Sequence, residues 1–169
     1  MLSKSLKPKR TKSPEQALAA LMRLAARSEK SSGDALRLMQ NWGVDPSARQ
    51  GVLQRLINDK FIDDRRYAEA FVRDKMRFSG WGVFKLRAAL RNKGISTDIV
   101  EDVLRMLDSN NMADRLRERL ERKMRTTKYT TRYDLKTKLM RYGASLGYDC
   151  ESVGDVVDTL ISEIEECHN

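Results

Sequence analysis

The stretch FIDDRRYAEAFVRDKMRFSGWGVFKLRAALRNKGI, residues 61–95, contains two helices and the joint between them. Apolar residues recur at helical spacing from Tyr67 to Met76 and again from Val83 to Leu90. The faces opposite these stripes carry mostly basic residues. We therefore predict two amphipathic helices, each with an apolar face toward a core and a cationic face toward solvent.

Signals for helix starts and ends flank both helices. Asp63 and Asp64 can accept hydrogen bonds from the free amides of a helix start, so we interpret them as caps rather than metal ligands. The sequence SGWG at 79–82 interrupts the first helix, and Gly94 can adopt the left-handed conformation that ends the second. Trp81 is either a core anchor in the joint or an exposed ring offered to a partner. The core position is favoured because tryptophan is usually well buried.

The rest of the chain repeats this pattern with a period of about fifty residues. Three glycines set the register, and each is followed by a valine nine residues on and a leucine thirteen residues on. The three sets are Gly43 with Val52 and Leu56, Gly94 with Val103 and Leu107, and Gly147 with Val156 and Leu160. In the third copy Leu135 and Leu139 precede Gly143 in the way that Leu86 and Leu90 precede Gly94. This spacing predicts one additional helical turn before Gly147.

Each copy contains three helical segments and almost no strand signals. A unit of about fifty residues buries little apolar surface by itself, so we expect the units to stack. We predict an all-α fold of tandem three-helix repeats. The predicted division is a basic flexible tail at 1–12, repeat 1 at 13–60, repeat 2 at 61–108, and repeat 3 with an acidic C-terminal helix at 109–169. Ser13, Pro14 and Glu15 mark the start of the first helix.

The composition indicates a soluble protein with an acidic partner. There are 33 Lys and Arg against 24 Asp and Glu, a net charge of +9, which favours a polyanion such as nucleic acid. No apolar run approaches the roughly 18 residues of a membrane helix, and we expect a cytoplasmic location without membrane association. Cys150 and Cys167, with His168 as the single histidine, are too few ligands for a structural zinc site. We predict free thiols, no metal and no cofactor.

The positive charge is concentrated in two stretches. Residues 65–93 contain nine basic and two acidic residues, and residues 115–141 contain eleven and three. Basic pairs four residues apart, such as Arg73 and Arg77, cost about 0.2–0.5 kcal/mol each in an isolated helix, which a bound polyanion would offset. The predicted recombinase- or DNA-binding residues are Arg73, Lys75, Arg77, Lys85, Arg87, Arg91, Lys93, Arg119, Arg122, Lys123, Arg125, Lys136, Lys138 and Arg141.

An alternative interpretation leaves some of these arginines as ordinary surface. Glu69 with Arg73, Glu118 with Arg122, and Glu121 with Arg125 have the spacing of intrahelical ion pairs. No catalytic motif is present: the chain has no Walker-type phosphate loop, no HExxH and no nucleophile elbow. We therefore do not predict an enzyme, although a nuclease site made of carboxylates alone stays open at this point.

The central stretch resembles the signature of a known family. The matching segments are Phe61-Ile62-Asp63-Asp64, Tyr67-Ala68-x-x-Phe71, Gly80-Trp81-Gly82 and Leu86-x-x-x-Leu90-x-x-Lys93-Gly94-Ile95. They are similar to those of the RecX family, bacterial regulators of the RecA recombinase. The resemblance is specific over residues 61–107 and looser over the first and third repeats. It implies a mainly structural role for the signature residues Asp63, Asp64, Tyr67, Ala68, Phe71, Gly80, Trp81, Gly82, Leu86, Leu90, Gly94 and Ile95.

This resemblance implies an elongated, curved helical protein that lodges in the groove of the RecA filament on DNA. Such a protein, expected as a monomer, lowers the ATPase, strand-exchange and co-protease activities of RecA in DNA repair and the SOS response. The basic faces would meet the acidic groove and the phosphates of single-stranded DNA, directly or through RecA. The alternative is a stand-alone helical DNA-binding module that does not act on RecA. The basic tail, the additional turn and the acidic C-terminus depart from the family pattern.

Overall fold

The computed structural model describes residues 11–166, and every regular element in that range is helical. The elements are α1 (Pro14–Ala25), α2 (Ser32–Asn41), α3 (Pro46–Asn58), α4 (Asp64–Asp74), the π-helical turn η1 (Lys75–Ser79), α5 (Val83–Asn92), α6 (Thr97–Arg105), α7 (Ser109–Thr126), α8 (Arg132–Leu146) and α9 (Cys150–Glu166). The predicted all-α fold is confirmed. The basic residues Lys4, Lys7, Lys9 and Arg10 of the predicted tail, like Cys167 and His168, lie outside the described residues.

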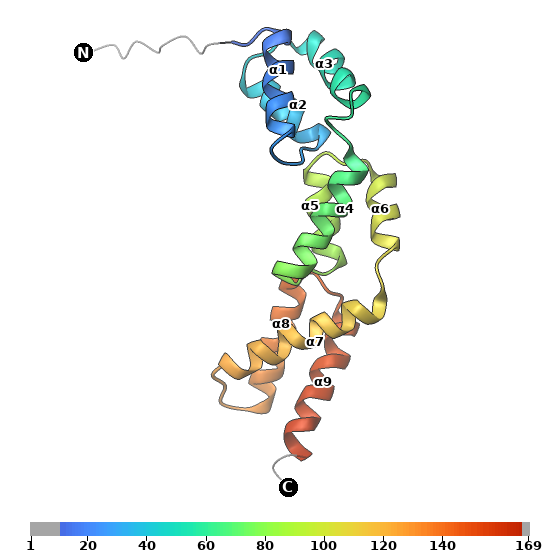
Figure 1. Cartoon of the computed structure of the whole chain (residues 1–169). Helices are drawn as coiled ribbons and strands as arrows, with labels where there is room; N and C mark the ends of the chain where they lie inside the picture. The colour runs from blue at the N-terminus through green and yellow to red at the C-terminus, as the bar shows by residue number, and fades with distance from the viewer. Residues whose placement is uncertain (1–10, 167–169) are drawn as a thin grey trace, which may run out of the picture.

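Three groups of three helices follow one another along an elongated, curved molecule (Figure 1). Within each group the third helix packs against the first, and it also packs against the second. Each group has a core of its own. These cores are centred on Leu21, Met39 and Leu56 in the first unit, Leu86, Leu90 and Val100 in the second, and Leu116, Leu139 and Leu160 in the third.

The second helix of every unit ends in the same backbone motif. Gly43, Gly94 and Gly147 all adopt positive φ, at 67°, 76° and 90°. The residue after each glycine donates its amide to the carbonyl five residues earlier: Val44 to Met39, Ile95 to Leu90 and Tyr148 to Gly143. This bond closes a Schellman-type end, and it turns the apolar residue that follows into the core. Val44, Ile95 and Tyr148 are accordingly all buried.

The additional turn of the third unit lies at the start of α8, not after Gly143 as the sequence spacing suggested. Counted back from the capping glycine, Gly143 occupies the place of Leu90, and Leu139 occupies the place of Leu86. A side chain at Gly143 would meet Val153, because a Cβ there would lie 2.5 Å from Val153 Cγ1. The helix is longer because it begins earlier, and Leu135 fills the added turn.

At the first joint, between the first and second units, the start of α2 lies against the end of α5. Ser31 Oγ donates to the carbonyl of Lys93 at 2.7 Å, and the amide of Ser32 donates to Asp64 Oδ1 at 2.8 Å. A Cβ on Gly33 would lie 2.2 Å from the Lys93 carbonyl oxygen and 2.9 Å from Gly94 Cα. Asp64 therefore caps α2 of the neighbouring unit, whereas Asp63 caps α4 through the amide of Arg66.

The second joint repeats this arrangement mainly through backbone groups, and Lys85 Nζ also donates to the Ser145 carbonyl at 3.0 Å. The amide of Gly82 donates to the Leu146 carbonyl at 2.8 Å, and the amide of Phe84 donates to the Gly147 carbonyl at 3.0 Å. The free amides of α5 are thus satisfied by the free carbonyls of α8. Consequently α2, α5 and α8 form an end-to-end column in which opposite ends of helix dipoles meet (Figure 1).

Two apolar residues lie outside the regular core pattern. Ile57, next to the buried Leu56, is 38% exposed near the end of α3. Met76 was expected to continue the stripe of α4, but the α-helix ends at Asp74 and Met76 lies in η1, partly buried between two cores. The change of helical pitch in η1 shifts the stripe at that point.

Candidate polyanion-binding surface

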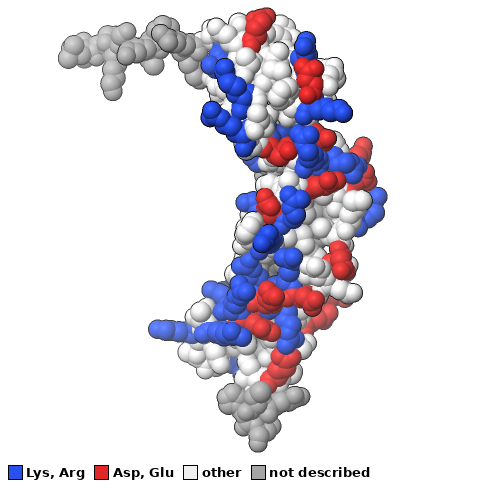
Figure 2. All heavy atoms as spheres, in the orientation of Figure 1, with Lys and Arg blue, Asp and Glu red and all other residues white. Residues whose placement is uncertain are grey.

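Lysine and arginine side chains gather on the hollow side of the curved molecule. In the view of Figure 2 blue atoms predominate along the inner curve, and most red atoms lie toward the other edge or in the middle of the face. The following contacts separate the cations that are available to a partner from those that the fold already uses.

Four of the predicted binding residues form salt bridges with carboxylates of this chain. Arg87 binds Glu101 through two hydrogen bonds of 2.7 and 2.9 Å, and this pairing raises the pKa of Arg87 and lowers the pKa of Glu101. The other three such pairs are Lys93 with Asp34, Lys136 with Asp158, and Lys138 with Asp134. Two further arginines have long contacts, Arg73 with Asp74 at 3.8 Å and Arg122 with Glu118 at 4.0 Å.

The remaining predicted residues have no carboxylate within salt-bridge distance among the described residues. They are Lys75, Arg77, Lys85, Arg91, Arg119, Lys123, Arg125 and Arg141. Of the intrahelical pairs considered from the sequence, only that of Glu118 with Arg122 forms. Glu121 binds Arg117 at 3.0 Å instead of Arg125. Arg125 therefore stays available to a partner.

Several cations that have no carboxylate partner among the described residues meet at the joint between the second and third units. Trp81 is partly buried against the second core, and the Nζ atoms of Lys75 and Lys85 each lie 4.9 Å from the centroid of its ring. Arg115 and Arg119 reach across from α7 to the carbonyls of Met76 and Phe78. Trp81 is thus both a core contact and a support for two ammonium groups.

Sequence reasoning placed Arg115 on the basic side of its helix but did not select it. Its Nη1 donates to the Met76 carbonyl at 3.4 Å, and it has no carboxylate partner in the described part of the chain. The signal available was its spacing of four residues from Arg119, which puts both guanidinium groups on one face of α7. Their docking onto η1 depends on the relative placement of two units, which no local pattern contains.

The signature residues build the second unit and its two joints. Tyr67, Ala68, Leu86, Leu90 and Ile95 are buried in its core. Phe71 is partly buried and packs against that core beside Trp81, with 6.2 Å between the ring centroids. Gly80 has φ of 66°, and a Cβ there would lie 2.5 Å from Arg119 Nε.

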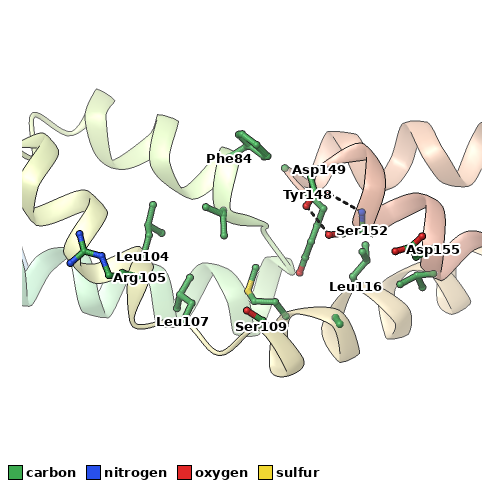
Figure 3. Close-up of a pocket in the computed structure, with 15 residues that line it drawn as sticks. Phe84, Leu104, Arg105, Leu107, Ser109, Leu116, Tyr148, Asp149, Ser152 and Asp155 are labelled. Atoms are coloured by element: carbon green, nitrogen blue, oxygen red, sulfur yellow. Dashed lines mark hydrogen bonds between the residues drawn. The ribbon is translucent and has the colours of Figure 1, made fainter.

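A hollow of about 500 Å³ lies between the second and third units (Figure 3). Its walls are mainly apolar, with Phe84, Leu104, Leu107 and Tyr148 among the lining residues. In this wall the Asp149 carboxylate accepts hydrogen bonds from the amide and the hydroxyl of Ser152, and so caps α9. These two polar groups are therefore used by the start of the helix.

Tyr148 differs from the other polar residues described in this wall because its hydroxyl group has no partner among the described residues. Its hydroxyl is buried and has no hydrogen-bond partner among the described residues, and burial raises its pKa while Arg115 and Arg119 act in the opposite direction. Within residues 11–166 no group of three or more His, Cys, Asp or Glu side chains could hold a metal ion. Over the same range, no helix is long and apolar enough to span a membrane.

Comparison with known proteins agrees with this architecture. A family model described as RecX, second three-helix domain, matches residues 63–104. The regulatory protein RecX of Clostridium botulinum (strain Alaska E43 / Type E3) is 33% identical over 134 residues, which cover 78% of this chain and 60% of that protein. The regulatory protein RecX of Mycobacterium sp. (strain KMS) is 29% identical over 147 residues, covering 85% and 80%.

Solved structures show the same fold. The crystal structure of RecX from Lactobacillus salivarius superimposes with a TM-score of 0.74 at 19% identity, covering 90% of this chain and 96% of that one. A second crystal structure of regulatory protein RecX gives 0.78 at 17% identity, covering 86% and 71%. The chain spans about 60% of the length of its clostridial relatives.

The fold and surface define a class: tandem three-helix repeat proteins that present a cationic inner curve. Within that class, the family is identified by the signature residues of the second unit and by the similar proteins described above. The chain belongs to the RecX family.

Proposed function

We propose that this chain is a non-enzymatic regulator, mainly an inhibitor, of the RecA recombinase. It binds in the groove of the RecA–DNA filament in the cytoplasm and modulates ATP hydrolysis, strand exchange and co-protease activity. The observation that carries the proposal is the gathering of lysine and arginine side chains along the inner curve of a molecule whose units are joined by hydrogen bonds between helix ends (Figure 2). The names of the relatives, regulatory proteins, support the same conclusion.

The charge pattern suits a helical polymer of opposite sign. Arg91 and Arg141 are exposed, lie on α5 and α8, and have no carboxylate partner in the described range. Because these helices belong to one column, their cations keep a fixed spacing when a partner binds. A fixed spacing reduces the entropy that is lost on binding to a regular surface.

The proposal is tested by single-stranded-DNA-dependent ATP hydrolysis of the cognate RecA. The full chain is expected to slow hydrolysis in a saturable way. The double variant Arg91→Glu/Arg141→Glu is expected to need about ten times more protein for half the effect, or roughly 1.4 kcal/mol of binding free energy. If saturating wild-type protein did not slow ATP hydrolysis by RecA, the proposal would be contradicted.

A matched control carries two reversals at arginines that already have partners. Arg55 binds Asp59 at 2.7 Å, and Arg105 binds Asp102 at 3.3 Å. Arg55→Glu/Arg105→Glu has the same net charge as the test variant and should act like the wild type. If it is equally weakened, net charge rather than the inner curve decides binding. If the chain binds bare DNA as well as it binds filaments without slowing ATP hydrolysis, it is a stand-alone DNA-binding module.

A further inference from the structure

The connection between α7 and α8 presents two tyrosines that the fold does not use. Tyr133 is 80% exposed and Tyr129 is 47% exposed. Neither tyrosine belongs to any of the three cores. Exposing a large ring to water costs free energy. A partner that covers the two rings removes this cost, which favours binding.

This connection is held in a defined shape. Lys138 Nζ donates to the Lys128 carbonyl at 2.9 Å, and the amide of Thr130 donates to Asp134 Oδ2 at 3.2 Å. At its beginning Thr127 Oγ1 donates to the Lys123 carbonyl at 2.6 Å. The tyrosines are therefore presented by an ordered turn, which limits the entropy lost when they bind a partner.

The charge around the tyrosines is strongly positive. Residues 123–138 contain six basic residues and one acidic residue, Asp134. The Asp134 carboxylate is already bound to Lys138, a contact that lowers its pKa. Arg125 and Lys128 are exposed and have no carboxylate partner in the described range. The turn thus places two aromatic rings near two cations, Arg125 and Lys128, that have no carboxylate partner in the described range.

A small hollow lies directly beside this turn. It measures about 240 Å³ and is lined by Tyr129, Arg132, Leu135, Ile161 and Ile164. That volume is below the roughly 300–1,000 Å³ of most small-molecule pockets. A flat group entering it would meet a tyrosine ring, a guanidinium group and three aliphatic side chains, which are the contacts that an unstacked nucleobase makes.

We propose that this turn, made of Arg125, Lys128, Tyr129, Arg132 and Tyr133, binds single-stranded DNA. The two tyrosines stack on successive bases, and Arg125 and Lys128 contact the flanking phosphates. A duplex does not fit the same contacts because its base faces are already stacked. In Figure 1 the turn projects from the lower end on the side of the inner curve. The choice of DNA over RNA rests on the proposed function, whereas the stacking chemistry does not.

The test measures binding of the full chain to fluorescently labelled oligo(dT) by anisotropy. Tyr129→Ala/Tyr133→Ala is expected to raise Kd at least about fivefold, the lower limit for the loss of one base stack. Tyr129→Phe/Tyr133→Phe should bind like the wild type, because stacking needs the ring and not the hydroxyl. A matched control, Phe78→Ala/Phe84→Ala, removes two other rings that are 68% and 58% exposed, and its affinity should not change.

Ultraviolet crosslinking gives an independent readout. An oligo(dT) containing 5-iododeoxyuridine should attach to Tyr129 or Tyr133, as located by peptide mass spectrometry. No binding by the wild type, equal affinity of the alanine variant, an equal loss in the phenylalanine control, or attachment elsewhere would each overturn the inference. Tighter tyrosine-dependent binding of oligo(rU) would overturn the choice of DNA.

Parallel ATPase measurements separate this inference from the proposed function. If the wild type slows RecA but oligo(dT) binding does not depend on the tyrosines, the inference fails and the regulator proposal stands. If binding depends on the tyrosines but RecA is not slowed, the inference stands and the regulator proposal fails.

Discussion

At Gly82 the backbones of two units approach most closely in the second joint. Its amide donates to the Leu146 carbonyl, and a Cβ added there would lie 2.4 Å from the Gly147 carbonyl oxygen and 2.7 Å from the Tyr148 amide nitrogen. These neighbours are backbone atoms, so no rotamer change can make room. Gly82 is required for contact between units rather than for an unusual φ, since its own φ is −87°.

Gly82→Ala is therefore expected to lower the free energy of unfolding by about 1–3 kcal/mol, as overpacking does in a close-packed interior. The measurement is the urea midpoint followed by circular dichroism. Gly154→Ala is the matched control, because Gly154 lies within α9 with nothing within 4 Å of its added Cβ. That control should raise stability by about 0.5–1 kcal/mol. An unchanged midpoint for Gly82→Ala would show that the joint can open freely.

The sequence alone indicated a break around Gly80 and Gly82 but not the different reasons for the two glycines. Gly80 needs glycine for its positive φ, a local property that a helix end makes predictable. Gly82 needs it because a distant carbonyl occupies the space of a side chain. Asp64 is similar: an acidic residue at a helix start is recognisable, but its capping of α2 depends on the stacking of two units.

At the level of elements, Arg87 and Glu101 connect α5 to α6. The guanidinium makes two hydrogen bonds to the carboxylate, and both side chains are about one-third exposed. This pairing lowers the pKa of Glu101 from its ordinary value of 4.5. A carboxyl group whose pKa is lower in the folded state stabilises the fold above its unfolded pKa, and this contribution disappears as the pH falls through the folded pKa.

Glu101→Gln is accordingly expected to lower Tm at pH 7, and the difference from the wild type should shrink as the pH falls below about 4.5. Thermal unfolding at a series of pH values measures this. Glu69→Gln on α4 is the control, since Glu69 has no ion pair in the described structure and should show little pH-dependent difference. A deficit that stays constant at low pH would indicate lost packing, with no electrostatic contribution.

Most helix starts have a side-chain cap from a neighbouring residue, and the starts of α5 and α6 are exceptions. The Ser13 hydroxyl accepts a hydrogen bond from the Gln16 amide, and the Gln16 side chain accepts one from the Ser13 amide. These bonds are expected for a helix that begins at Pro14. The start of α5 has no side-chain cap, because the carbonyls of α8 take that role. The π-helical turn η1 could not be predicted from periodicity, since its stripe resembles a continuing α-helix.

At the level of the whole molecule, the distribution of free cations could be predicted only in part. The two basic stretches were evident from composition, and eight of the fourteen selected residues have no carboxylate partner among the described residues. The partners of Arg87 and Lys93 come from other helices, Glu101 on α6 and Asp34 on α2. Such pairs depend on tertiary packing, which spacing within one helix does not contain.

Salt dependence should reveal which cations contact phosphates. The logarithm of the binding constant for oligo(dT) is expected to fall linearly with the logarithm of salt concentration, with a slope of about 0.7 per phosphate contact. Arg91→Ala should reduce this slope by about 0.7. The control Arg87→Ala/Glu101→Gln removes an internally paired arginine on the same helix without changing net charge, and its slope should equal that of the wild type. Equal slopes for both variants would place Arg91 away from the nucleic acid.

The end-to-end column of α2, α5 and α8 has a consequence for synthesis on the ribosome. Because α2 is capped by groups of the second unit and α5 by carbonyls of the third, each unit is completed by residues that are translated after it. The helices that leave the exit tunnel last therefore still lack the groups that cap them. The start of α5 is capped only when Gly147 has emerged, so a premature stop before that residue removes hydrogen bonds from the second unit as well as residues from the third.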